Sequence, residues 1–149
     1  MTAQTAAGST IAIGATPPAT FDAAGYAALT LTEVGGVDKI GTISPTFAKV
    51  EFQPLKGAKD KLKGSYDSGS LSPSMALDML DAGQILMQTA AADKTQKLYP
   101  FKVTLQDGAK RYFMGRVFGM PETIDSSDTV VMANPTVEIC SDVVKVAAS

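Results

Sequence analysis

The sequence predicts a mainly β fold: an antiparallel β-sandwich or partly closed barrel with one flanking α-helix, a long polar loop and a flexible N-terminal arm. Two observations carry this prediction. Short segments of alternating apolar residues recur from residue 27 to the end, with Gly, Pro, Asn and Asp between them. Only one stretch repeats its apolar residues at helical spacing, and such a helix packs its apolar stripe against a sheet.

Size and composition fit one folded domain. The chain has 149 residues, of which 45% are hydrophobic and 19% charged, and its formal net charge is −2. This charge argues against a generally basic nucleic-acid-binding domain. His is absent and Cys140 is the single cysteine, which removes the commonest general base, an internal disulfide and a multi-cysteine zinc site. We therefore expect no enzyme, no cofactor and no metal.

Residues 1–25 are rich in Ala, Thr, Gly and Pro, and Pro17-Pro18 interrupts regular structure. They predict an arm that is loose in the monomer. It is either a frayed terminus or an arm that docks on a neighbouring subunit, where Ile11 and Ile13 add a short strand. The start has no secretion signal and no stretch is long enough for a membrane helix, so we expect synthesis in the cytoplasm.

The domain proper is predicted over residues 26–149, and its first strands are expected at residues 27–34 and 37–43. Gly35-Gly36 between them is a two-residue hairpin signal. Residues 47–52 alternate again, so that Lys49 and Glu51 face away from Val50 and Phe52.

Residues 53–74 form the least ordinary segment, since they are too polar for a core and too long for a tight turn. The segment predicts one of three things: a solvated loop, a self-association loop or a nucleic-acid contact. The candidate contact residues are Lys56, Lys59, Asp60, Lys61, Lys63, Tyr66 and Asp67.

A helix is predicted over about residues 75–91, with Ser74 as its N-cap and a weak point at Gly83. Residues 99–105 and 110–118 then predict a β-hairpin around an Asp107-Gly108 type I′ turn. Residues 121–128 form an acidic loop, either solvated or a weak cation holder. The last strands are expected at residues 129–132 and 136–140.

Charge is unevenly distributed along the chain. Residues 39–63 hold six lysines against two acids, whereas residues 120–149 hold five acids against Lys145. Opposite charges on different regions of one subunit suit head-to-tail association between copies.

Five stretches, in their order and spacing, resemble the major tail tube protein of long-tailed (siphophage) bacteriophages, a family that shares its fold with other phage tail tubes and the type VI secretion tube. They are residues 31–40, the loop at 53–74, the helix start at 78–84, the hairpin at 101–117 and the closing strand at 136–140. Together they span about residues 28–146.

The resemblance implies a structural protein of the phage tail, which stacks as usually hexameric rings into a tube around a tape-measure protein. DNA passes through the lumen without specific binding. The long loop at residues 53–74 and the arm at 1–25 would reach the neighbouring ring. Implied partners are further copies of the chain, the tape-measure protein, and the tail terminator and distal tail proteins; no membrane is implied.

Two other functions stay open on the residues alone. One is a small β-barrel module that binds nucleic acid through Lys49, the lysines of residues 53–74 and Tyr66. The other is a hydrolase that uses Asp or Glu, although the carboxylates do not cluster in the sequence.

Overall fold

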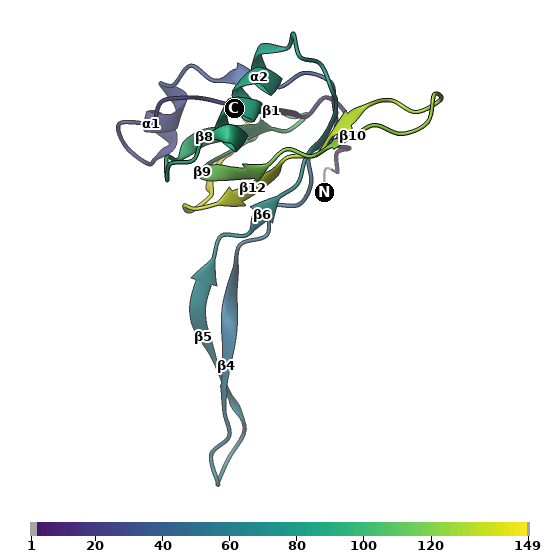
Figure 1. Ribbon diagram of the computed structural model, residues 1–149. Coiled ribbons are helices and arrows are strands. Elements are labelled where there is room, and N and C mark those ends of the chain that lie inside the picture. Colours follow the sequence, from purple (N-terminus) through teal and green to yellow (C-terminus); the bar gives the residue numbers. More distant parts are fainter. Residues whose placement is uncertain (1–2, 149) are drawn as a thin grey trace.

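A seven-stranded antiparallel sheet dominates the computed structural model, which describes residues 3–148 (Figure 1). Its strand order is β2-β1-β8-β9-β12-β6, and β13 pairs with the first part of β9. The strands are β1 (Thr10–Ile13), β2 (Thr32–Glu33), β6 (Ser70–Leu71), β8 (Tyr99–Thr104), β9 (Lys110–Gly119), β12 (Thr136–Ile139) and β13 (Val144–Val146).

A second layer packs on one face of this sheet. It consists of helix α2 (Ala82–Ala92) and a four-stranded sheet in the order β10-β11-β7-β3. The four strands are β3 (Val37–Lys39), β7 (Ser74–Ala76), β10 (Glu122–Thr123) and β11 (Met132–Ala133). The predicted mainly β fold, with antiparallel sheets and a flanking helix, is confirmed; across residues 3–148 the sheets stay open rather than closing into a barrel.

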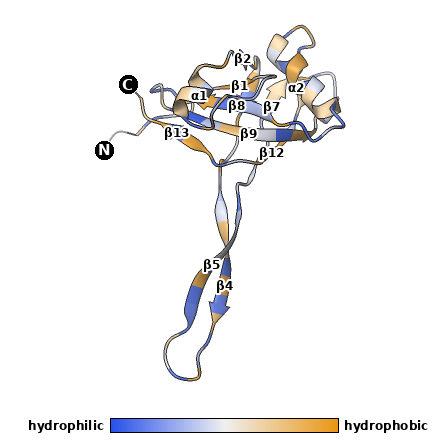
Figure 2. Cartoon of the chain, turned by 90° about the vertical axis from the view of Figure 1, so that its left-hand side faces the viewer, coloured by the Kyte–Doolittle hydropathy of each residue, from blue (hydrophilic) through white to orange (hydrophobic). Residues whose placement is uncertain are grey.

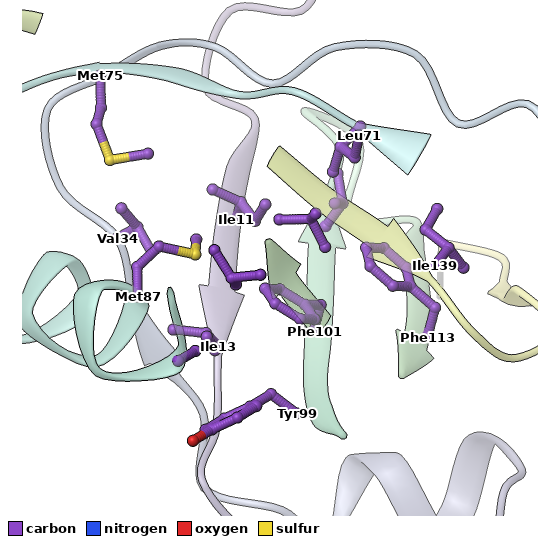
Figure 3. Close-up of a cluster of buried hydrophobic side chains, with 14 of the residues drawn as sticks. Ile11, Ile13, Val34, Leu71, Met75, Met87, Tyr99, Phe101, Phe113 and Ile139 are labelled. Atoms are coloured by element: carbon purple, nitrogen blue, oxygen red, sulfur yellow. The ribbon is translucent and has the colours of Figure 1, made fainter. Parts of the chain in front are cut away.

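The main core lies between the two layers. Ile11, Ile13, Phe101 and Phe113 from the large sheet share one buried cluster with Met87 of α2, and all five side chains are fully buried (Figure 3). The Phe101 and Phe113 rings stack with centroids 5.3 Å apart. Burial of aromatic and branched side chains at this density supplies the main free energy that holds the layers together.

The other face of the large sheet carries a smaller cluster. Because side chains alternate along a strand, Tyr112 and Met114 of β9 point away from Phe113 and meet Tyr26 of helix α1 (Ala23–Ala27). The Tyr26 and Tyr112 rings stack at 5.2 Å. Strand β9 is therefore buried on both faces.

The hairpin predicted at residues 99–118 is confirmed as β8 and β9, with Phe101 opposite Phe113. Its turn is not type I′. That turn needs a positive φ at both central residues, whereas only Gly108 has one, at 96°, and Asp107 does not. The Asp107 side chain instead accepts a hydrogen bond from the Ala109 N–H at 2.9 Å.

Part of the arm predicted over residues 1–25 is built into the sheet of the monomer, which corrects the prediction for residues 10–13; residues 1–2 lie outside the described residues. Residues 10–13 form β1, which lies inside the large sheet between β2 and β8. Ile11 and Ile13 are fully buried in the chain's own core, so they are not free to add a strand to a neighbour. Their alternation with Ala12 marks a strand, which the surrounding Gly and Pro obscured.

The hairpin predicted around Gly35-Gly36 is also wrong. Strand β2 pairs with β1 in the large sheet, while β3 pairs with β7 in the small one. The two glycines therefore carry the chain from one layer to the other. A local turn signal does not specify which strands pair, because pairing also depends on the apolar surface each strand can bury.

Helix α2 starts later than predicted. Residues 74–76 are strand β7, and the N-cap is Asp81, whose carboxylate accepts from the backbone N–H groups of Gln84 and Gly35, each at 3.0 Å. Gly83 lies in the first turn rather than at a break. A Cβ there would lie 2.3 Å from the Glu33 carbonyl oxygen, so glycine allows α2 to approach the chain beside β2.

The end of α2 is tied to β8 by a carboxylate. Asp93 accepts hydrogen bonds from the Thr95 hydroxyl at 2.6 Å, the Thr95 N–H at 2.8 Å and the Tyr99 hydroxyl at 2.7 Å. These bonds, those of Thr95 first, lower the pKa of Asp93 from about 4 to about 2. Burial, and then the bond to Asp93, raise the pKa of Tyr99 to about 12.

This pair predicts a two-sided pH dependence of stability. Because the pKa of Asp93 is lower in the folded chain, its contribution is complete above about pH 4 and is lost as the pH falls toward 2. Because the pKa of Tyr99 is raised, its contribution is complete below about pH 10 and is lost as the pH rises toward 12. Urea unfolding against pH should show both slopes, and Asp93→Asn should flatten the acid one. An unchanged acid slope in this variant would contradict the assignment.

Candidate self-assembly surface

A long β-hairpin projects from the body of the molecule. Strands β4 (Thr46–Phe52) and β5 (Asp60–Asp67) pair only with each other in a separate two-stranded sheet. Figures 1 and 2 show this sheet extending away from the rest of the fold. The loop predicted over residues 53–74 is therefore wrong in form: residues 60–67 are strand, and only residues 53–59 make the tip. We call residues 46–67 the β4–β5 hairpin.

An aromatic pair holds the base of the hairpin. Phe47 lies opposite Tyr66 in the register, and their ring centroids are 4.8 Å apart. The Lys63 ammonium nitrogen lies 4.9 Å from the centre of the Phe47 ring, which adds a cation–π contact. Asp67 accepts from the Gly69 N–H at 2.9 Å where the chain turns back into the body. The hairpin is therefore ordered at its base although water surrounds it.

One face of the hairpin is charged. Lys49 and Lys63 are opposite each other, as are Glu51 and Lys61. Glu51 forms ion pairs with the ammonium groups of Lys49 at 3.0 Å and Lys59 at 3.5 Å. Pairs this exposed contribute little to stability. Lys49, Lys61 and Lys63 outnumber Glu51 on this face, so its net charge is positive. The whole hairpin holds five lysines against Glu51, Asp60 and Asp67.

The other face is mainly apolar. Val50 lies opposite Leu62, and Phe52 follows on the same face toward the tip, opposite Asp60. Their exposed fractions are 48% for Val50, 51% for Leu62 and 62% for Phe52, and Leu55 at the tip is fully exposed. A two-stranded ribbon buries neither face by itself, so these side chains meet water in the isolated chain.

The structure brings together all seven contact residues that the sequence singled out within this segment. Lys56 and Lys59 lie at the tip, and the others lie on β5, all of them exposed. The apolar residues of the other face were not among the predicted contact residues. The signal was present in the alternation of residues 47–52, whose predicted facing of Lys49 and Glu51 away from Val50 and Phe52 agrees with the register.

A second projection extends from the small sheet, and we call residues 122–131 the β10–β11 arm (Figure 1). It contains the predicted acidic loop. Glu122, Asp125 and Asp128 are exposed, and so are the apolar side chains of Ile124 and Val130, at 75% and 64%. A turn at its tip is closed by the Thr129 N–H, which donates to the Ser126 carbonyl at 3.1 Å.

Residues 3–148 contain no cluster of three or more acidic, Cys or His side chains placed to hold a metal ion. None of the helices in this range is long and apolar enough to cross a membrane. Cys140 is exposed and lies 3.4 Å from the Arg116 guanidinium.

Solved structures share this fold over nearly the whole chain. A chain in the cryo-EM structure of an extracellular contractile injection system, the PVC sheath/tube terminator in the extended state, matches with a TM-score of 0.73 and 7% identity, over 99% of both chains. A chain of the anti-feeding prophage baseplate, 6-fold symmetrised, matches with a TM-score of 0.70 and 9% identity, over 100% of this chain and 99% of that one.

A third match is a chain of the PVC sheath-tube complex in the extended state, with a TM-score of 0.67 and 8% identity over 93% of this chain and 88% of that one. No protein-family model matches the sequence, and no curated protein does. The chain therefore has a fold that also occurs in chains of an extracellular contractile injection system and of an anti-feeding prophage baseplate.

Proposed function

We propose that this chain is a structural, non-enzymatic subunit that assembles with copies of itself into stacked rings, and that these rings form the tube of a phage tail or a tail-like particle. The rings are hexameric in this proposal, and the tube is a conduit around a tape-measure protein. The tail terminator and distal tail proteins cap it, as the resemblance to tail tube proteins implies.

The observation that carries the proposal is the apolar face of the β4–β5 hairpin. Val50, Phe52 and Leu62 are about half exposed on a ribbon that stands clear of the body. Exposed apolar groups on one side of a projecting ribbon indicate a surface that becomes buried in a partner. The fold shared with chains of sheath-tube and baseplate assemblies supports a second copy as that partner.

The proposal is tested by concentrating the purified full chain and following it by negative-stain electron microscopy and sedimentation velocity. Rings or tubes of uniform diameter are expected above a critical concentration, because each added subunit buries apolar surface. A chain that stays monomeric at every concentration tested, also with a tail terminator or distal tail protein added as a template, would overturn it.

The nucleic-acid-binding module is separated from this proposal by a salt titration. Binding through the lysines of the β4–β5 hairpin would weaken steeply as salt rises. We expect no binding of a labelled single-stranded oligonucleotide at 50 mM salt, since the chain has a net charge of −2 and Glu51, Asp60 and Asp67 lie among the lysines of the hairpin. Salt-sensitive binding by a chain that never assembles would favour the module.

A further inference from the structure

A groove of about 700 Å³ opens at one end of the sandwich. Its apolar lining includes Ile40, Ile43, Val103 and Leu105, which also contact the main core. The N-terminal turn at residues 6–9 forms one wall. Gln4 holds the chain before this turn in place, since its side-chain oxygen accepts from the Asp107 N–H at 3.1 Å.

The groove carries more positive than negative charge. Lys39 and Arg111 line it together with the single acid Asp38. An occupant that complements this groove is therefore apolar along its length and acidic at its edges.

The β10–β11 arm has this chemistry. Its apolar residues Ile124 and Val130 are exposed, and the acids Glu122, Asp125 and Asp128 surround them. The chain has no Lys or Arg between Arg116 and Lys145, so no cation near the arm in the sequence offsets this charge. The β4–β5 hairpin is a poorer match. Its lysines outnumber its acids, and the groove also holds more cations than acids, so the two surfaces would repel each other.

The β10–β11 arm and the groove lie at opposite ends of the folded molecule, along the direction of strand β9. Arg111, in the groove, is near the start of β9, and the arm begins just after β9 ends at Gly119. A ten-residue strand spans about 30 Å. In the small sheet, β10 and β3 are the two edge strands. The arm extends only about four residues beyond β10, or about 13 Å, so it does not reach its own groove.

We propose that the groove receives the β10–β11 arm of a second copy of this chain. The contact rests on the proposed self-assembly and names its receiving surface. Because the two surfaces differ and lie at opposite ends, the contact is heterologous, and repeating it generates either a closed ring or an open filament. Ile124 and Val130 then cover the apolar lining, while the acids of the arm face Lys39 and Arg111.

Disulfide trapping tests the contact directly. In a Cys140→Ser background, one sample carries Thr42→Cys in the groove and the other carries Ser127→Cys at the tip of the arm. Mixed at a concentration at which the unmodified chain assembles, they should give at least about tenfold more linked dimer than a matched control pair, because docking raises the effective concentration of the two thiols. The control pairs Ser127→Cys with Thr89→Cys on α2, which is exposed but outside the groove.

Charge reversal provides a second, independent test of the contact. Lys39→Glu with Arg111→Glu, or Asp125→Lys with Asp128→Lys, should each raise the critical concentration for assembly by about tenfold or more. Mixing the two reversed chains should restore the trapping yield, since the charges are again opposite.

The outcomes separate this inference from the proposed function. If the unmodified chain assembles but the groove–arm pair links no better than the control, the arm–groove contact is overturned and the assembly proposal stands. If the unmodified chain never assembles and no pair links, both are overturned.

Discussion

Replacing Val50, Phe52 and Leu62 together with threonine is expected to abolish ring and tube formation and to leave the monomer folded. Each side chain is about half exposed, so docking buries roughly half of its surface. Complete burial of such a side chain contributes about 1.5–3 kcal/mol, and half-burial of three gives about 3 kcal/mol per hairpin. This weakens each contact roughly a hundredfold, and a tube repeats the contact in every subunit.

The stability of the monomer should hardly change in this variant. The β4–β5 hairpin forms its own sheet, and threonine keeps the β-branched preference that favours strands. Exposed substitutions of this kind usually change the free energy of unfolding by about 0.5 kcal/mol or less, which corresponds to a shift in melting temperature of about 2 °C. Electron microscopy, sedimentation and thermal unfolding on the same samples separate the two effects.

A matched variant tests which face of the hairpin docks. The control variant replaces three residues on the charged face of the same strands: Lys49→Thr, Lys61→Thr and Lys63→Thr. We expect this chain still to form tubes. If it loses assembly while the apolar-face variant keeps it, the charged face is the docking surface and our assignment is wrong.

Gln84→Met is expected to destabilise the fold by about 2–4 kcal/mol. The Gln84 side chain is fully buried. Its oxygen accepts from the Asp78 N–H at 2.9 Å, and its nitrogen donates to the carbonyls of Gly35 and Ala76, each at 2.8 Å. Methionine has a similar volume but leaves these three part-buried backbone groups without their partner. A fully buried group so left costs about 1–3 kcal/mol, and partial access to water lowers the cost to about 1 kcal/mol for each of the three.

This loss is a large share of a domain's stability of about 5–15 kcal/mol. Urea unfolding measures it, with Gln88→Met as the control one turn further along α2. Gln88 is only half-buried, and its side-chain contacts are to the Met79 sulfur and the Glu122 carboxylate rather than to the backbone. We expect a change below about 1 kcal/mol for the control. Equal effects in both variants would show that Gln84 does not link β7, α2 and the Gly35 turn.

Local patterns in the sequence predicted strand pairing correctly where a strand pairs with the next strand in the chain. The β8–β9 hairpin shows this, since residues 99–105 and 110–118 alternate strongly and a short turn joins them. The facing of Lys49 and Glu51 away from Val50 and Phe52 followed from strand geometry alone. The same patterns also identified residues 53–74 as unusual, because that stretch is too polar to be core.

Pairing across long stretches of chain was decided only by the tertiary structure. Residues 10–13 look like part of a loose terminus, yet β1 lies between β2 and β8 because Ile11 and Ile13 complete the main core. Residues 60–67 look like polar loop, yet they pair with β4 because a strand with open hydrogen-bonding groups is best satisfied by another strand.

The start of α2 differs from its prediction for the same reason. Helical spacing extends back to Leu77, but Met75 is buried in the core as part of β7, and this removes residues 74–76 from the helix. The sequence by itself determined the class of fold, the strongest hairpin and the segment that stands apart. The tertiary structure decided which strands are neighbours and which end of the molecule each charged segment occupies, because those choices depend on apolar surface buried between residues far apart in the chain.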